Sequence, residues 1–232
     1  MSYKIVLQRP GQSPETRHVE FREIRPGEPP TALELLLQVQ EDELPDLAFR
    51  YGCRNKLCGI CTIDINGKPR LACRQKLKDG DELSAMATLP VIKDLVVRRD
   101  AINRQLQGRI PRTSKSRADN GGPVQNDDYD SLNRCIECYF CLDRCPLHAR
   151  NDEADHRAGL PHGNPYAFLK VRQAVVDPLA DETEREAALD VARDLGIEAC
   201  VGCDGCKCGI GINLMKEVIR PLVSATRPGD PA

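Results

Sequence analysis

The chain has 232 residues, of which 41% are hydrophobic, so it can form one large domain or two smaller ones, each with a core. Its 33 basic and 35 acidic residues give a formal net charge of −2, which excludes the strongly basic surface of a dedicated nucleic-acid-binding protein. No apolar run approaches the roughly 18 residues of a membrane span, and the first residues lack the apolar core of a secretory signal. We therefore expect a soluble cytoplasmic protein. The unusual feature is twelve cysteines with no tryptophan.

Strand signals open the chain. Residues 3–8 form a β-rich run and residues 17–24 alternate polar and apolar side chains, which together predict a hairpin. A second hairpin is predicted at Asn66-Gly67, the strongest such signal in the chain, with strands at 62–65 and 70–73.

A helix is expected between these hairpins. Thr31 followed by Glu34 is the capping-box pattern, which predicts a helix from about residue 32 to residue 41. Four side chains are expected on one face of it: Leu33, Leu36, Leu37 and Gln40. Strands, one helix and a cysteine-containing loop indicate a β-grasp domain, with expected limits 1–107.

The composition changes after that domain. Residues 108–130 are rich in Pro, Ser, Asn, Asp and Gly and are expected to form a linker. The remainder, residues 131–232, is expected to be α-helical. Its helices are predicted at 132–144, 166–177, 182–195 with Gly196 as C-cap, and 212–225.

The linker carries a short basic run, made of Arg109, Arg112, Lys115 and Arg117. A solvated loop accounts for such a run, and a docking patch for a phosphate or a partner is the alternative.

The cysteines fall into three groups of four. They are Cys53, Cys58, Cys61 and Cys73; Cys135, Cys138, Cys141 and Cys145; and Cys200, Cys203, Cys206 and Cys208. Because a cytoplasmic chain is kept reduced, metal ligation explains them better than disulfides.

The first group has the C-x4-C-x2-C…C spacing of plant-type ferredoxins, in which four thiolates hold a [2Fe–2S] cluster. Gly52 and Gly59 let the backbone pass close to such a cluster and point its N–H groups inward. A structural zinc site is the alternative, although zinc sites usually pair two short knuckles.

The second group, C-x2-C-x2-C-x3-C-P, is the bacterial-ferredoxin run, whose first three cysteines hold one cluster while the fourth reaches another. It requires a further cysteine run, which the third group supplies as C-x2-C-x2-C-x-C. The expected fold class is therefore α+β, with a β-grasp [2Fe–2S] ferredoxin-like domain followed by an α-helical two-cluster ferredoxin-like domain.

These motifs, in this order, resemble the iron–sulfur subunit of succinate dehydrogenases and fumarate reductases. The resemblance covers nearly the whole chain. The segments that carry it are 50–54, 58–61, 65–67 and 71–73 around the first group, 89–95 after it, Cys135-Ile136-Glu137-Cys138 and Cys145-Pro146, and Gly163-Asn164-Pro165 through Arg172 and Asp177.

The resemblance implies an electron-transfer subunit of an oxidoreductase complex, with no substrate chemistry on this chain. Electrons would pass between an FAD-containing flavoprotein subunit and a quinone or membrane-anchor subunit through three clusters. The implied ligands are Cys53, Cys58, Cys61 and Cys73 for [2Fe–2S]; Cys135, Cys138, Cys141 and Cys208 for [4Fe–4S]; and Cys145, Cys200 and Cys206 for the third cluster. The chain would lie at the inner face of the cell membrane through its partner subunits.

Three features depart from the family pattern. Cys203 stands where a three-iron third cluster has no ligand, so that cluster is [4Fe–4S] if Cys203 binds it and [3Fe–4S] if Cys203 is spare; we favour the four-iron form. Lys56 replaces a small residue in the [2Fe–2S] loop, where it either raises the cluster potential or is simply solvated. The family's quinone site uses a tryptophan after Cys-Pro, and this chain has His148 in that segment instead.

Other polar residues have weaker signals. His148 either assists proton transfer or is a polar loop residue. Arg54 and Lys56 are candidates for docking the flavoprotein. His18, His156 and His162 are expected to be surface residues. A related flavoprotein oxidoreductase with a different substrate and a non-quinone acceptor is the alternative function, and a zinc-stabilised interaction protein is the third.

Overall fold

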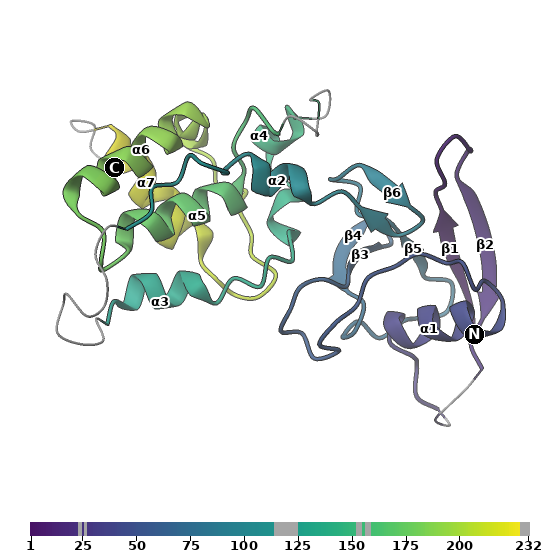
Figure 1. Ribbon diagram of the computed structural model, residues 1–232. Helices are drawn as coiled ribbons and strands as arrows, with labels where there is room; N and C mark the ends of the chain where they lie inside the picture. The colour runs from purple at the N-terminus through teal and green to yellow at the C-terminus, as the bar shows by residue number, and fades with distance from the viewer. Residues whose placement is uncertain (23–24, 26, 114–124, 152–154, 156–158, 228–232) are drawn as a thin grey trace. The chain divides into compact units, whose positions relative to one another are not determined.

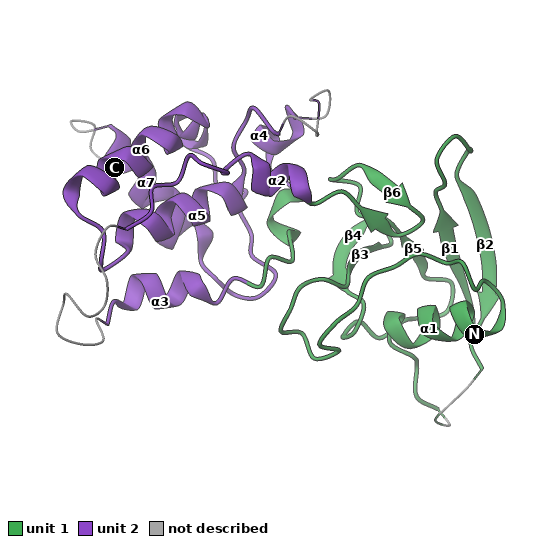
Figure 2. Ribbon diagram, in the orientation of Figure 1, with its two compact units in different colours: residues 1–99, 136–143 green, residues 100–135, 144–232 purple. Residues whose placement is uncertain are grey.

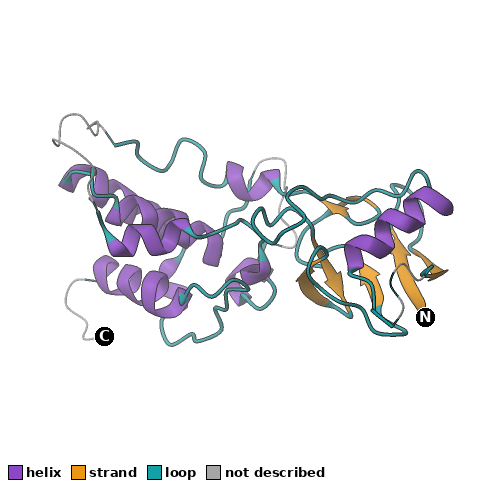
Figure 3. Ribbon diagram, turned by 90° about the horizontal axis from the view of Figure 1, so that it is seen from below, coloured by secondary structure: helices purple, strands orange, loops and turns teal. Residues whose placement is uncertain are grey.

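The computed structural model describes residues 1–22, 25, 27–113, 125–151, 155 and 159–227 (Figure 1). The chain divides into two compact units, one made of 1–99 with 136–143 and the other of 100–135 with 144–232 (Figure 2). All described strands lie in the first unit, and the described part of the second unit consists of helices and loops (Figure 3). This mixed arrangement agrees with the expected α+β class.

The first unit is built on a five-stranded sheet in the order β2-β1-β5-β3-β4. Strand β1 pairs antiparallel with β2 and parallel with β5, and β3 pairs antiparallel with both β4 and β5. The strands are β1 (Ser2–Leu7), β2 (Glu15–Glu20), β3 (Thr62–Ile65), β4 (Lys68–Leu71) and β5 (Glu82–Ser84). A separate two-stranded sheet follows, made of β6 (Val91–Lys93) and β7 (Val96–Val97).

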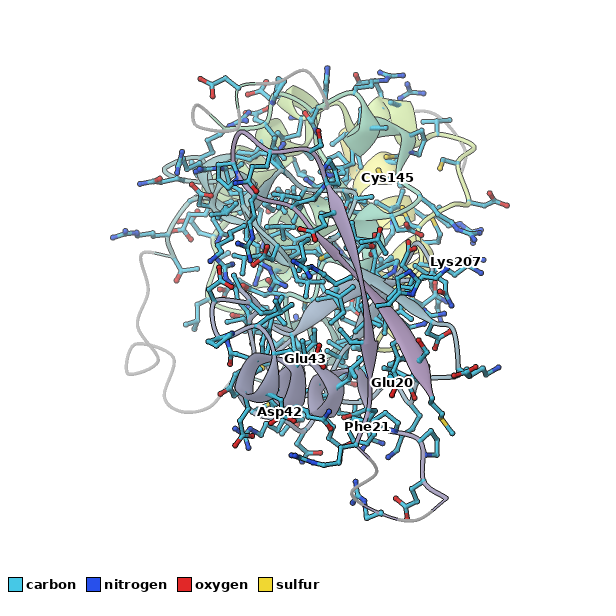
Figure 4. The ribbon with its side chains drawn as sticks, turned by 90° about the vertical axis from the view of Figure 1, so that its right-hand side faces the viewer. Glu20, Phe21, Asp42, Glu43, Cys145 and Lys207 are labelled. Carbon is cyan, nitrogen blue, oxygen red and sulfur yellow. The ribbon has the colours of Figure 1, made fainter. Side chains whose placement is uncertain are left out.

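Both predicted hairpins are confirmed, with shifted strand limits. Strand β2 begins at Glu15 and ends at Glu20; residues 23–24 of its predicted range lie outside the described residues. Strand β4 begins at Lys68, earlier than predicted, because Asn66 and Gly67 both have positive φ, 51° and 67°, which lets Ile65 pair directly with Lys68. Figure 4 labels Glu20 and Phe21 where β2 ends.

Helix α1 (Ala32–Asp42) is the predicted capped helix. The Thr31 side chain accepts a hydrogen bond from the Glu34 amide at 3.2 Å, and the Glu34 carboxylate accepts one from the Thr31 amide at 2.6 Å. Figure 4 labels Asp42 and Glu43, where this helix ends.

The buried face of α1 differs from the predicted one. The fully buried apolar positions follow the i, i+3, i+4, i+7 pattern: Ala32, Leu35, Leu36 and Val39. Leu37 and Gln40 are only half-buried, because they lie at the border of that stripe. The helix joins the sheet in one core that includes Tyr3, Ile5, Ile63 and Leu83.

The second unit is helical as predicted, and two of its helices match closely. Helix α5 (Pro165–Val176) begins after Asn164, whose side chain caps it, and α6 (Glu182–Asp194) ends before Gly196, which has a φ of 81°. These two helices pack against each other. The remaining elements are α2 (Asp100–Arg104), α3 (Asp127–Asn133), α4 (Pro146–Ala149), the short 3-10 helix η3 (Ile197–Cys200), the π-helical turn η4 (Met215–Ile219) and α7 (Arg220–Thr226).

Two helix predictions need correction. The helix expected at 132–144 is absent there; α3 ends at Asn133, and only the short 3-10 helix η2 (Phe140–Leu142), which belongs to the first unit, follows before α4. Glu137 and Tyr139 have φ of 54° and 61°, a left-handed conformation that breaks a right-handed helix. The last helix starts slightly later than predicted, with η4 leading into α7.

The predicted domain limits, 1–107 and 131–232, stay a prediction, and the compact units differ from them in two respects. Residues 100–107, predicted in the first domain, belong to the second unit. Residues 136–143 belong to the first unit, although they follow the predicted linker. That linker, 108–130, falls partly outside the described residues, and α3 begins inside it at Asp127. None of the described helices has the length and apolarity to cross a bilayer.

Candidate metal centres

The four cysteines of the first group lie side by side in the first unit. Cys53 and Cys58 are hydrogen-bonded neighbours, the Cys58 charge acts on Cys61, and Cys61 and Cys73 are hydrogen-bonded to each other. The β3–β4 hairpin brings Cys73 back to the loop, because the Ala72 amide donates to the Cys61 carbonyl at 3.0 Å. The structure therefore gathers the residues that the spacing predicted.

Backbone amides stabilise negative charge on the exposed side of this group. The amides of Asn55 and Leu57 both donate to Cys53 Sγ at 3.3 Å. These hydrogen bonds lower the pKa of Cys53 from 9.0 to about 7. Arg54 and Lys56 hold the loop in this shape, with φ of 55° and 49°. Backbone donors of this kind favour a thiolate, which is the form that binds iron.

The inner side of the group is shielded from solvent. Cys61 and Cys73 are buried, and burial together with the neighbouring thiols raises the pKa of Cys61 to about 11. A buried thiolate beside other thiolates needs a cation to compensate its charge. Bound iron supplies such a cation, so the chemistry of the four sulfur donors fits the predicted cluster.

The loop of the first group contacts the second cysteine segment within the same unit. A β-carbon on Gly59 would lie 2.8 Å from the Cys138 amide nitrogen. The Arg99 guanidinium donates to the carbonyls of Gly59 and Ile60, at 3.4 and 3.0 Å, and its Cζ lies 5.3 Å from the Tyr139 ring centroid. Sequence reasoning missed Arg99, since no local motif marks a residue that contacts positions 40 residues away in both directions.

The second group is divided between the units. Cys138 and Cys141 belong to the first unit, and Cys135 and Cys145 belong to the second. Cys138 is buried, and the positive φ of Glu137 and Tyr139 on either side of it sets the loop conformation.

Four thiols gather in the second unit, and they come from two groups. Cys203 acts electrostatically on Cys145, and both act on Cys200 and Cys206. The Cys203 amide donates to the Cys200 carbonyl at 3.1 Å, which forms the turn between them. Figure 4 labels Cys145. Cys203, whose role the spacing left open, thus lies with the three predicted ligands of the third cluster.

Burial controls the titration of these thiols. It raises the pKa of Cys200 and of Cys206 to about 12, with the neighbouring thiols adding to the effect, and it also raises the pKa of Cys145. The His148 amide donates to Cys145 Sγ at 3.4 Å. As in the first group, such thiols are suited to bind the positively charged iron–sulfide core of a cluster as thiolates.

Cys208 has a different environment. The Ile210 amide donates to its Sγ at 3.4 Å, and Cys208 is not among the thiols that act on Cys200 or Cys206. Its expected place in another cluster stays a prediction. Figure 4 labels Lys207, the residue before it.

No disulfide joins any two of the twelve cysteines, all of which are described. Among the described residues, no three His, Cys, Asp or Glu side chains converge on a point that could hold a single metal ion.

A cavity of about 350 Å³ opens beside the third group in the second unit. Its lining is mainly apolar and includes two arginines and one aspartate, Asp204. The lining residues include Val201, Cys203, Met215, Arg220, Val223 and Arg227. Such a cavity can accept a flat apolar molecule or an apolar side chain from a partner.

The other candidate residues are placed as follows. His148 is only 4% exposed and lies in α4, so it is not the polar surface-loop residue that one interpretation expected. Arg54 and Lys56 are exposed, and Arg54 stacks on the Tyr51 ring at 5.1 Å. His18 is exposed and His162 is half-buried, whereas His156 lies outside the described residues.

The basic run is partly described. Arg109 forms an ion pair with Asp194 at 3.2 Å and is thus engaged within its own unit. Lys115 and Arg117 lie outside the described residues.

Known proteins are similar to this chain in sequence and in fold. Residues 3–104 match the family described as 2Fe-2S iron-sulfur cluster binding domain. The chain is 29% identical over 226 residues to a fumarate reductase (CoM/CoB) subunit of Methanothermobacter marburgensis, covering 96% of this chain and 43% of that protein. It is 28% identical over 211 residues to a mitochondrial succinate dehydrogenase [ubiquinone] iron-sulfur subunit 1 of Oryza sativa, covering 82% of this chain and 69% of that protein.

The fold also has a solved relative. A chain of the Mycobacterium smegmatis Sdh1 complex in the apo form superposes with a TM-score of 0.79 at 22% identity, covering 99% of this chain and 97% of that one. The chain spans between 26% and 59% of the length of the first curated relatives it matches. The order of cysteine motifs, the matched [2Fe–2S] domain and these relatives agree: the chain is similar in sequence to iron–sulfur subunits of succinate dehydrogenases and fumarate reductases, and it shares the fold of a chain of an Sdh1 complex.

Proposed function

We propose that this chain carries electrons between an FAD-containing flavoprotein subunit and a quinone or membrane-anchor subunit, through three iron–sulfur clusters. The observation that carries the proposal is the gathering of four thiols in each unit, one set around Cys53 and Cys61 and another around Cys145 and Cys200. The clusters, when bound, supply one-electron transfer; the chain itself performs no bond-making chemistry on a substrate.

Each cysteine group then has a defined task. Cys53, Cys58, Cys61 and Cys73 hold the [2Fe–2S] cluster, and the amides of Asn55 and Leu57 stabilise its outer thiolate. The four cysteines Cys135, Cys138, Cys141 and Cys208 hold a [4Fe–4S] cluster. Cys145, Cys200, Cys203 and Cys206 hold the third cluster.

The third cluster is proposed to be [4Fe–4S], because Cys203 lies with Cys145, Cys200 and Cys206. A three-iron cluster needs only three of these thiols and would leave Cys203 as a spare, half-buried neighbour. Four gathered sulfur donors supply one ligand for each iron of a cubane.

The exposed rim of the first group is the proposed docking face for the flavoprotein. Tyr51 and Leu57 are 40% and 67% exposed, and Arg54 and Lys56 add two positive charges between them. An apolar patch with charges of one sign suits a partner with an acidic rim.

The cavity beside Cys203 is the proposed entry for the electron acceptor. Its apolar lining supports a quinone-type ring or an apolar partner side chain, and Arg220 and Arg227 suit a polar or anionic group at the edge. Association with the inner face of the cell membrane would come through partner subunits. The absence of tryptophan keeps the alternative open, a related flavoprotein oxidoreductase with a different substrate and a non-quinone acceptor.

Anaerobic purification of the full chain with its flavoprotein tests this function. We expect a brown protein with acid-labile sulfide, and reduction of its clusters on addition of the flavoprotein's own reduced substrate. A colourless protein with zinc and no sulfide contradicts the proposal and favours a structural zinc protein.

A further inference from the structure

Arg99 contacts both cysteine segments of the first unit with a single guanidinium. Nη1 and Nη2 donate to the carbonyls of Gly59 and Ile60, the two residues between Cys58 and Cys61. The Cζ atom of the same guanidinium lies 5.3 Å from the ring centroid of Tyr139, the residue after Cys138. One side chain therefore joins the loop of the first group to the loop of the second.

The positive charge of Arg99 has no carboxylate to pair with in the described part of the chain. Its Nε is buried without a hydrogen-bond partner among the described residues. The charges that act on it are those of Tyr139, Cys138 and Cys61, which are favourable, and that of Arg50, which is not. A half-buried cation in this position is costly unless nearby negative charge compensates it.

Iron–sulfur clusters bring that negative charge. Each thiolate ligand carries one negative charge, and the net charge of the cluster becomes more negative when it accepts an electron. A fixed cation beside the ligands stabilises the reduced form more than the oxidised form, which raises the reduction potential.

We propose that Arg99 is a positioning residue that ties the loop of the first cysteine group to that of the second, and that its charge raises the reduction potential of the clusters bound by Cys61 and Cys138. This inference rests on the proposed function. Arg99 lies outside all three cysteine motifs. The inference explains why its guanidinium occupies a site formed by two carbonyls and an aromatic ring.

The test is a redox titration of the full chain, followed by electron paramagnetic resonance, on wild type and three variants of Arg99. R99M and R99Q remove the charge, and R99Q keeps an amide that can still donate to the two carbonyls. R99K keeps the charge and loses the fork geometry. Arg17→Met is the matched control, since Arg17 is exposed on β2 at the opposite edge of the sheet from β4 and pairs with Glu15.

We expect R99M and R99Q to lower the equilibrium constant for one-electron reduction of both the first and the second cluster at least tenfold, which is 59 mV for one electron. R99K, Arg17→Met and the third cluster of every variant should stay within threefold of wild type. The third cluster is the internal control, because none of its cysteines is among the charges that act on Arg99.

Two results overturn the inference. One is an unchanged potential in R99M and R99Q at full iron content, which makes Arg99 a purely mechanical contact. The other is a reduction potential lowered as much in R99K as in R99M and R99Q, which makes the fork geometry, and not the charge, responsible. Wild-type protein in the same series separates these results from failure of the proposed function, because a wild type without reducible clusters contradicts the function itself.

Discussion

The backbone of Cys138 lies against Gly59 so closely that a β-carbon on Gly59 would come within 2.8 Å of the Cys138 amide nitrogen. This contact places one loop of the [2Fe–2S] domain directly on the second cysteine segment. Gly59 also has a φ of +64°, which other residues adopt only at a cost. The glycine that the sequence suggested for wrapping a cluster thus has a second function, which is to let two cysteine loops meet.

We predict that Gly59→Ala destabilises the chain by more than the matched change Gly67→Ala. Gly67 has nearly the same φ, +67°, but open space around it, so alanine there costs only the left-handed conformation, about 1–2 kcal/mol. Gly59→Ala adds an overpacked backbone contact, typically worth roughly 1–3 kcal/mol more. The apparent melting temperature of each variant at one heating rate, together with its iron content, measures the two losses of stability. Equal losses in the two variants would show that the Gly59–Cys138 contact is loose.

The role of Cys203 leads to a second prediction. If Cys203 binds the third cluster, Cys203→Ala should convert that cluster to a three-iron form, with loss of about one iron and a new paramagnetic signal in the oxidised protein. Cys145→Ala is the control, because removal of a ligand in either alternative should abolish the third cluster. An oxidised three-iron signal already present in wild type, and unchanged in Cys203→Ala, would mean that Cys203 is spare.

The cavity beside the third group should control acceptor access. Val223→Phe places a larger side chain in a cavity of about 350 Å³, so we expect a several-fold slower reaction with the physiological acceptor and an unchanged iron content. Ala225→Phe is the matched control, since Ala225 is exposed on the same helix and does not line the cavity. Equal rates in the two variants, at wild-type level, would show that the acceptor site lies elsewhere.

Asp64 predicts a pH dependence of stability. This carboxyl is 4% exposed in β3, and burial raises its pKa above 3.8, although its Oδ2 accepts a hydrogen bond from the Ala87 amide at 2.9 Å. Since the folded chain holds the proton more tightly than the unfolded chain, this group's contribution to stability is present below pH 3.8 and is lost as the pH rises through the folded pKa.

Asp64→Asn should therefore raise the unfolding free energy at neutral pH and flatten its decline with rising pH. The amide keeps an oxygen for Ala87 and carries no charge. Chemical unfolding at several pH values measures the slope. A variant less stable than wild type at neutral pH would indicate that the charged carboxylate is needed in β3.

Local signals predicted much of the fold. The capping box at Thr31 and the Asn66-Gly67 turn act over a few residues, so the sequence specifies them directly. The prediction of a helix at 132–144 was wrong because hydrophobic periodicity does not show that Glu137 and Tyr139 adopt the left-handed conformation.

The site was predictable where spacing alone defines it and unpredictable where packing decides. The three cysteine groups followed from their intervals, and the structure brings the four thiols of the first group together. The place of Cys203 depended on how the loop 200–206 turns toward Cys145, and that of Arg99 on contacts with residues 40 positions away on either side. The residues that flank Cys203 and Arg99 in the sequence do not indicate either contact.

The most direct measurement is the iron and acid-labile sulfide content of the anaerobically purified chain, together with its paramagnetic resonance before and after reduction by dithionite. We predict about ten irons per chain in three clusters, with no three-iron signal in the oxidised protein. A content well below that value, or any one of the three cysteine groups found without iron, would contradict the proposed path for electrons through this chain.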